Sequence, residues 1–219
     1  MFRLIAFFLC FFAPCLGNAG AWPREHGTVY LAFSEIMTVN SLGVPRRFQS
    51  LYAEYGLSPQ LTLGFDGFRS GSGESTETFL FLSFPLHTNN LRNRYALTFA
   101  IGEHADLTGA PAPALRIGLN WGRNIGSSWL AINNFATFRK ASDTPLLKLD
   151  ATWGYHFSDH IDLMLNLRAE IYDGATSKIE IAPGLTWQTG VGNRIEVGLS
   201  IGAAEHREYG LKIGTVRKF

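Results

Sequence analysis

The feature that most constrains this chain is a long hydrophobic alternation with a period of two residues. Between residues 161 and 171 every second side chain is aliphatic, and polar residues such as Asp162, Asn166 and Arg168 lie between them. In an extended strand successive side chains point to opposite faces, so this segment has one apolar and one polar face. The same pattern recurs along the chain, and after Trp22 no apolar stretch reaches the ~20 residues of a transmembrane helix. We therefore expect an all-β protein.

Twelve candidate strands follow from this alternation, and a count of ten to twelve is compatible with it. Their approximate ranges are 27–37, 48–57, 60–69, 77–87, 93–103, 113–123, 128–138, 145–156, 160–172, 177–189, 193–202 and 206–219. Two segments are less clear: 78–86 is apolar on both faces, and Asn133 and Asn134 interrupt the pattern in 129–138.

The connections between these strands alternate in length. The odd-numbered ones are longer, near 39–47, 70–76, 105–112 and 140–144, and the even-numbered ones are shorter, near 58–59, 124–127, 157–159 and 190–192. Outer-membrane barrels have short periplasmic turns and longer outer loops. An even number of strands with both ends in the periplasm reproduces this order, so we predict one antiparallel up-and-down transmembrane β-barrel over residues 22–219.

The first 21 residues have the pattern of a cleavable export signal. Arg3 supplies the positive start, an apolar run follows from Leu4 to Phe12, and Ala19 and Ala21 form a small-x-small cleavage pattern around Gly20. We predict a signal peptide over residues 1–21, with cleavage before Trp22 or within a few residues of it. Both cysteines of the chain, Cys10 and Cys15, lie in this segment, so the exported protein would contain no disulfide.

Three features favour a membrane barrel over a soluble β-sandwich, which also alternates. The candidate strands are about ten residues or longer, whereas soluble strands average about 5–6. Only 17% of the residues are charged, below the roughly 25% of soluble domains. Large aromatic residues lie on the apolar face near strand ends, where a barrel meets the membrane–water interface. These predicted interfacial residues are Tyr95, Trp121, Trp153, Tyr155 and Trp187.

The end of the chain carries a further sign. Tyr209, Leu211 and Ile213 share one face of the last strand with Phe219. This strand resembles the C-terminal signature by which the barrel-assembly machinery recognises bacterial outer-membrane proteins, although Thr215 and Arg217 stand where apolar residues are usual. The resemblance implies that Phe219 is an assembly signal and that the protein resides in the outer membrane of a Gram-negative bacterium, among lipid and lipopolysaccharide.

If the apolar face meets lipid, the polar face lines the interior of the barrel. Antiparallel pairing would then join Lys148 to Glu170 and Asp150 to Arg168. Eight-stranded barrels are filled by side chains, whereas 16–18 strands leave a channel, so twelve strands permit either a narrow pore or a filled barrel. The candidate pore-lining residues are Arg94, Arg116, Asn120, Lys148, Asp150, Asp162, Asn166, Arg168, Glu170, Lys178, Glu180, Arg194 and Glu196.

The strand count, loop order and terminus resemble those of small twelve-stranded outer-membrane channels and transporters. This resemblance implies a pore for the passive or facilitated diffusion of small hydrophilic solutes. The first alternative is a non-conducting structural or adhesion barrel that acts through its outer loops.

The second alternative is a lipid-modifying hydrolase. His156 and Ser158 faintly resemble the His-x-Ser of lipid A deacylases, with Asp159 or Asp162 as a third group. The pair lies in a predicted periplasmic turn, away from outer-leaflet lipid, so we expect no catalytic activity. The six histidines show no zinc-site spacing, and we expect no metal or cofactor. The net charge of +1 gives no general basic field for nucleic acid.

Overall fold

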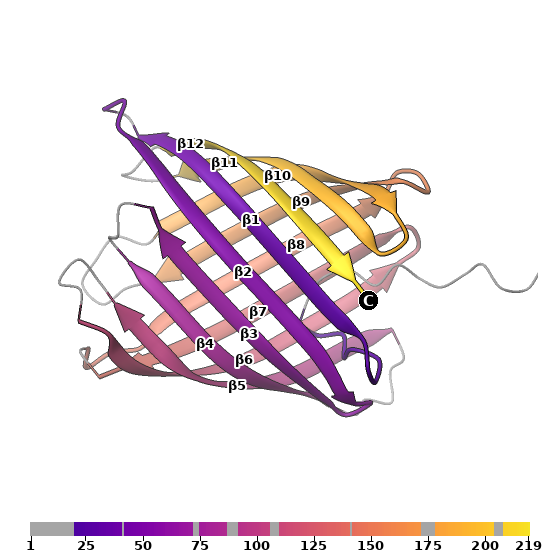
Figure 1. Cartoon of the computed structure of the whole chain (residues 1–219), viewed down its shortest axis with the longest axis horizontal. Coiled ribbons are helices and arrows are strands. Elements are labelled where there is room, and N and C mark those ends of the chain that lie inside the picture. Colours follow the sequence, from indigo (N-terminus) through magenta and orange to yellow (C-terminus); the bar gives the residue numbers. More distant parts are fainter. Residues whose placement is uncertain are drawn as a thin grey trace, which may run out of the picture.

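The computed structural model describes residues 20–40, 42–71, 75–86, 92–105, 110–140, 142–171, 178–203 and 208–219, which form a closed antiparallel barrel (Figure 1). Its strands are β1 (Val29–Asn40), β2 (Pro45–Ser58), β3 (Leu61–Ser70), β4 (Thr76–Leu86), β5 (Asn93–Ala105), β6 (Ala112–Ile125), β7 (Ser128–Arg139), β8 (Leu146–His156), β9 (Ile161–Ile171), β10 (Lys178–Gly190), β11 (Asn193–Ala203) and β12 (Glu208–Lys218).

Each strand pairs with its neighbours in the chain, and β1 pairs with β12 to close the barrel. At this seam the Val29 amide donates to the Phe219 carbonyl at 3.2 Å, and the Phe219 amide donates to the Val29 carbonyl at 2.9 Å. The predicted fold class and the count of twelve strands are confirmed, and every strand boundary lies within three residues of its predicted position. A closed barrel leaves no sheet edge, so all backbone groups along the strands can pair without water.

The aliphatic face of every strand points outward. On β9 the outward side chains Leu163, Leu165 and Leu167 are each about two-fifths exposed. Asp162 and Asn166, in the alternate positions, point into the barrel. A continuous apolar outer surface is the arrangement that lipid requires. Among the described residues, no helix is long and apolar enough to cross a membrane.

The connections differ between the two ends of the barrel. At the end where β1 begins and β12 finishes, the connections are residues 59–60, 87–92, 126–127, 157–160 and 191–192. At the other end they are 41–44, 71–75, 106–111, 140–145, 172–177 and 204–207. The predicted alternation therefore holds except at 87–92, which is as long as the connections opposite. Because outer-membrane barrels have their shorter turns in the periplasm, the first end is the periplasmic end.

Inward-facing aromatic rings lie over glycines on the neighbouring strand. Four direct cross-strand pairs have this form: Phe81 with Gly64, Phe79 with Gly102, Phe135 with Gly118 and Trp129 with Gly154. A Cβ added at any of these glycines would approach the ring more closely than real Cβ atoms do. The pairs explain why 78–86 is apolar on both faces. Leu80, Leu82 and Phe84 face outward, while the inward rings of the same strand cover glycines.

Several predicted features lie outside the described residues. They are most of the export signal (1–19) and two of the six histidines, His87 and His206.

Candidate functional site

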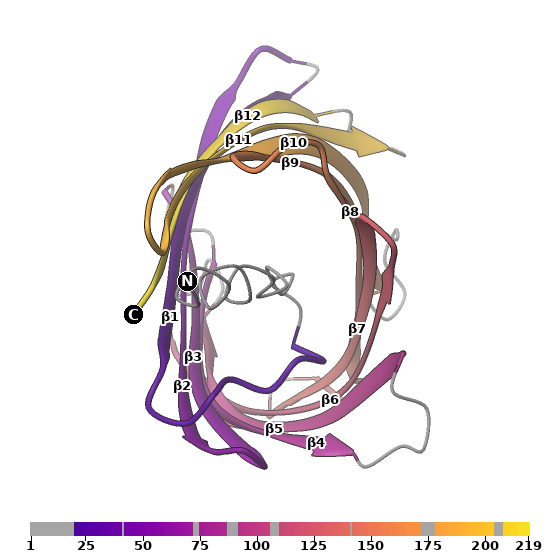
Figure 2. The ribbon, with the colours of Figure 1, turned by 90° about the vertical axis from the view of Figure 1, so that its right-hand side faces the viewer.

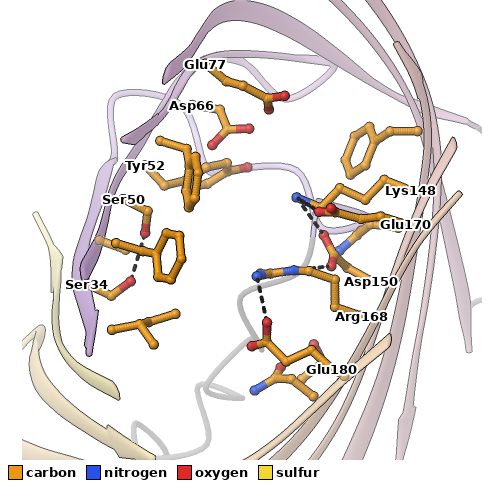
Figure 3. A pocket seen from close by; sticks show the side chains of 18 of the residues that line it. Ser34, Ser50, Tyr52, Asp66, Glu77, Lys148, Asp150, Arg168, Glu170 and Glu180 are labelled. Atoms are coloured by element: carbon orange, nitrogen blue, oxygen red, sulfur yellow. Dashed lines mark hydrogen bonds and ion pairs between the residues drawn. The ribbon is translucent and has the colours of Figure 1, made fainter. Parts of the chain in front are cut away.

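The interior of the barrel holds a cavity of about 750 Å³. Inward side chains from all twelve strands line it, from Arg46 and Glu208 near the outer end to Tyr30 and Glu54 near the periplasmic end. Two walls of different chemistry face one another across it (Figure 3). Their positions follow from the alternation of each strand, which sends every second side chain inward.

One wall, formed by β1 to β4, combines aromatic rings with small hydroxyl side chains. Tyr52 packs edge-on against Tyr30, with ring centroids 6.2 Å apart, and stacks on Phe81 at 5.6 Å. Ser34 and Ser50 are hydrogen bonded to each other at 2.8 Å. Nearer the outer end, Phe48 and Phe68 stack at 5.9 Å. These contacts hold the rings in place, so this wall presents a firm surface to the cavity.

The opposite wall, formed by β8 to β10, is a ladder of alternating charges. Arg168 Nε donates to Asp150 Oδ1 at 2.9 Å, and its Nη1 lies 3.9 Å from Glu180 Oε2. Lys148 Nζ lies 3.7 Å from Asp150 Oδ2 and 4.0 Å from Glu170 Oε1. The predicted cross-strand partners, Lys148 with Glu170 and Asp150 with Arg168, are confirmed by the register of β8 and β9.

Arg116 on β6 is the most enclosed cation of the cavity. Its Nη1 donates to Asp66 at 2.7 Å, its Nη2 to Glu77 at 2.9 Å and its Nε to Thr137 at 3.1 Å. The guanidinium carbon lies 3.8 Å from the centre of the Phe79 ring. A planar guanidinium can satisfy two carboxylates at once in this way, which a lysine ammonium does less well.

The charges of the cavity nearly cancel. Among its described lining residues there are seven lysines and arginines and eight carboxylates. Beyond the clusters above, Lys212 Nζ lies 2.7 Å from Glu196 Oε1, and Arg46 Nη1 lies 2.9 Å from Glu208 Oε1. Paired charges in a narrow lumen cost less to bury than single ones. They also leave little net field to select anions or cations.

The structure places most of the predicted pore-lining residues on this cavity. Arg94, Asp162 and Arg194 do not line it: Arg94 is exposed near the start of β5, and the other two form an ion pair near the periplasmic end. The positions of these three residues in their strands direct the side chains inward, but the residues lie beyond the end of the cavity along the barrel axis. The role of the whole set in conduction stays a prediction. The residues that line the cavity are Arg116, Asn120, Lys148, Asp150, Asn166, Arg168, Glu170, Lys178, Glu180 and Glu196.

Residues 20–28 form a segment that the sequence did not predict, named here the N-terminal strap. It runs across the opening of the barrel before it enters β1 (Figure 2, indigo). Ala21 and Trp22 are almost completely buried against Trp129 and Ala131 of β7. The Trp22 ring lies on Gly122, where any Cβ would collide with it. The strap therefore narrows the periplasmic mouth of the cavity.

The second half of the strap is held by the aromatic wall, through β2 and β3. The Arg24 guanidinium forms a buried ion pair with Glu54 on β2 and lies 4.1 Å from the centre of the Tyr30 ring. The Arg24 amide donates to Thr62 Oγ1 at 3.2 Å. Backbone hydrogen bonds from Gly27 to Gly56 at 2.9 Å and from Gly56 to Thr28 at 3.1 Å extend the β1–β2 pairing. The strap is thus fixed at both sides of the lumen.

The candidate hydrolase residues lie at the same periplasmic end. His156 Nδ1 is 2.6 Å from Asp162 Oδ1, and the His156 ring packs on Trp129 with centroids 4.9 Å apart. Asp162 also accepts from Arg194 Nη1 at 2.5 Å. The structure therefore joins His156 to Asp162, as a third group would require, but shows no hydrogen bond between His156 and Ser158 among its described contacts. The described residues contain no cluster of three potential metal ligands.

The predicted interfacial aromatics lie on the outer face near the periplasmic end. Tyr95 and Trp121 are direct partners across β5 and β6, and Trp153 and Tyr155 stack at 6.4 Å on β8. Trp187 on β10 is more than half exposed, next to Ile161 at the start of β9. Their contact with a membrane interface stays a prediction.

These observations define a twelve-stranded barrel with an apolar exterior, a polar lumen and a strap at its periplasmic mouth. No family model and no curated protein matches the chain. Solved structures do resemble it. The KdgM porin in complex with disordered oligogalacturonate has a TM-score of 0.65 and 12% identity, covering 87% of this chain and 99% of that one. An outer membrane channel from Pseudomonas putida F1 has a TM-score of 0.64 and 12% identity, covering 93% and 100%.

An enzyme of similar fold also appears among these structures. Outer membrane phospholipase A from Escherichia coli has a TM-score of 0.51 and 14% identity, covering 92% of this chain and 98% of that one. At these identities the likeness shows the fold alone. It agrees with the predicted location in the outer membrane, and the two channels resemble this barrel more closely than the enzyme does.

Proposed function

We propose that this protein is a narrow outer-membrane pore for the diffusion of small hydrophilic solutes. The observation that carries the proposal is the polar cavity of about 750 Å³, lined by paired charges on one side and by aromatic and hydroxyl side chains on the other. A barrel filled by its own inward side chains would leave no cavity of this size. The size of the cavity falls in the ~300–1,000 Å³ range of small-molecule sites, which suits monomers or short oligomers rather than polymers.

The near balance of charge favours solutes without strong net charge. Five of the seven described lysines and arginines that line the cavity lie against at least one carboxylate, so most of its positive charge is paired; these five are Arg46, Arg116, Lys148, Arg168 and Lys212. The KdgM porin was solved with an oligogalacturonate, and a saccharide of modest length is a reasonable class of solute here as well. Aromatic faces and paired polar groups can both contact a polyhydroxylated ring.

The test is single-channel conductance of the purified, refolded barrel in a planar bilayer, with heat-modifiable gel migration as the check of folding. Stable currents that change in Arg168→Ala would support the pore, because this side chain lies in the charged wall. Leu165→Ala on the same strand is the matched control, since Leu165 faces lipid and should leave the current unchanged. A folded barrel that carries no current would exclude the pore and favour a structural or adhesion role for the outer loops.

The absence of catalytic activity remains part of this proposal. His156 and Asp162 are joined, but the pair lies at the periplasmic end, whereas outer-leaflet lipid lies at the other end. Hydrolysis of phospholipid or lipid A by the refolded barrel, abolished by Ser158→Ala, would contradict it.

The same proposal includes export and membrane assembly. An export signal over residues 1–21 would direct the chain to the periplasm, and the barrel-assembly machinery would recognise the last strand through Phe219. The outward aliphatic side chains would then contact lipid, with lipopolysaccharide around the outer end. Replacement of Phe219 by Ser should reduce the amount of heat-modifiable barrel in outer-membrane fractions, and unchanged levels would remove its proposed role.

A further inference from the structure

Two asparagine side chains in the lumen have unused hydrogen-bond acceptors. Asn120 on β6 is 1% exposed, and its Nδ2 donates to Thr98 Oγ1 at 2.9 Å, but its Oδ1 has no donor among the described residues. Asn133 on β7 is its direct cross-strand partner, and its Oδ1 is also buried without a donor. Buried acceptors are normally satisfied, because a missing hydrogen bond costs the desolvation of the group. Two adjacent amide oxygens without donors indicate that a hydrogen-bond donor binds between them.

The start of the strap lies against both amides. A Cβ built on Gly20 would lie 3.1 Å from Asn120 Nδ2 and 3.7 Å from Asn133 Oδ1. Gly20 therefore lies beside both amide groups, with Asn133 Oδ1 among its nearest atoms. Asp150 is the cross-strand partner of Asn133 on β8, so a carboxylate lies beside the amides as well. This corner of the lumen is suited to a group with several donors and a positive charge.

Ala21 and Trp22 belong to the folded wall rather than to a discarded segment. Ala21 is fully buried beside Trp129, and the Trp22 ring occupies the space left open at Gly122. Two overlapping small-x-small patterns precede them, one formed by Gly17 and Ala19 and the other by Ala19 and Ala21. Cleavage after Ala21 would remove a residue that packs in the lumen. Cleavage after Ala19 would retain it and would begin the exported chain at Gly20.

We propose that signal peptidase cleaves this chain between Ala19 and Gly20, and that Asn120 and Asn133 bind the new α-ammonium inside the barrel. Hydrolysis of the Ala19–Gly20 amide consumes one water, leaving a carboxylate on Ala19 and an ammonium on Gly20. An ammonium has three donors, which is enough for both amide oxygens and one water or carboxylate. With this cleavage the mature chain would begin at residue 20 rather than at residue 22.

This inference rests on the predicted export signal but not on conduction, so its failure would leave the proposed pore untouched. The first test is N-terminal sequencing of barrel purified from outer membranes. A sequence beginning Gly-Ala-Trp is expected. A sequence beginning at Trp22, or any start that lacks Gly20, would overturn the proposal.

The second test measures whether the α-amine is held. An amine-reactive ester is added to folded and to denatured barrel, and labelling of the N-terminal peptide is followed by mass spectrometry, with the exposed Lys218 as internal reference. The folded barrel should label at the α-amine about tenfold more slowly than the denatured chain, the effect expected of a hydrogen-bonded charged group. Equal labelling in both states would also overturn the proposal.

A matched pair of variants separates binding from simple enclosure. Asn133→Leu removes one acceptor and should raise the labelling rate of the folded barrel. Asn134→Leu changes the adjacent residue, which belongs to the outward-facing series and donates to the Leu119 carbonyl, and it should not. If both variants label like the unchanged protein, the strap encloses its amine without the asparagines, and the binding site is refuted. Sequencing and labelling of the unchanged barrel keep the proposal testable if either variant fails to fold.

Discussion

Replacement of Arg116 by alanine should change the ion selectivity of the lumen in a calculable direction. The described lining residues carry one more carboxylate than they carry cations, and Arg116→Ala would raise this excess to two. It would also remove the guanidinium that pairs with Asp66 and Glu77, while Glu77 keeps its contact with His104 Nδ1 at 3.2 Å. A cation about 4 Å from a freed carboxylate gains about 1 kcal/mol in a water-filled lumen, roughly a fivefold preference.

The assay is the reversal potential of a planar bilayer under a potassium chloride gradient. We expect the permeability of K⁺ relative to Cl⁻ to rise about fivefold in dilute salt. The change should shrink near 1 M salt, where the screening length falls to about 3 Å. Arg116→Ala with Glu77→Gln is the charge-matched control, because it returns the lumen to one excess carboxylate. Its selectivity should return toward that of the unchanged protein.

The same substitution should lower stability. Removing one partner of a buried ion pair costs about 3–5 kcal/mol. Asp66 is about one-third exposed to the hydrated lumen, so we expect a cost at or just below the lower end of this range, about 2–3 kcal/mol. The temperature at which the heat-modifiable band disappears should therefore fall, and the added Glu77→Gln should restore part of it. A folded, conducting Arg116→Ala barrel with unchanged selectivity would refute the reasoning that this cluster lies in the ion path.

Three further predictions concern the wall itself. Leu165→Arg places a charge on the lipid face and should lower the free energy of unfolding by about 2–4 kcal/mol if residue 165 lies near the membrane centre. Urea titration of the refolded barrel in vesicles measures this free energy, and an unchanged value would argue against lipid contact at residue 165. Gly118→Ala places a Cβ 2.7 Å from Phe135 and should lower the free energy of unfolding by about 1–3 kcal/mol in the same titration. In the control Gly190→Ala the new Cβ meets nothing closer than 3.7 Å, so the free energy of unfolding should not change. Trp187→Ala should slow refolding into vesicles, because an interfacial ring is lost; an unchanged rate would place this residue away from the interface.

The architecture was predictable because the two-residue period is repeated in strand after strand. In β9 the separation of Leu163, Leu165 and Leu167 from Asp162 and Asn166 assigned each side chain to its face, and the same rule gave the pairing of β8 with β9. A register slip of one residue would have exchanged lipid and lumen faces, so the pattern specifies register strongly.

Other features depend on contacts that no local pattern contains. The register of β4 could not be assigned because Phe79 and Phe81 point inward, and the glycines that accommodate them lie on β5 and β3. The strap was missed because Trp22 and Arg24 follow the export signal and show no period. Arg94 was placed on the lumen by its face, but its height along the barrel was not encoded in the alternation.

The pairing of aromatic rings with glycines has a consequence for how wide this barrel is inside. The inner diameter of a barrel grows with its number of strands. Here each ring occupies space that a side chain on the neighbouring strand would fill, so bulky residues point inward without a second side chain beneath them. Exchange of Gly64, Gly118 or Gly154 for larger residues would push the neighbouring ring toward the centre, because the atoms nearest to the new Cβ belong to that ring. Evolution could therefore adjust the calibre of such a barrel one glycine at a time, independently of the strand count and of the outer surface that lipid contacts.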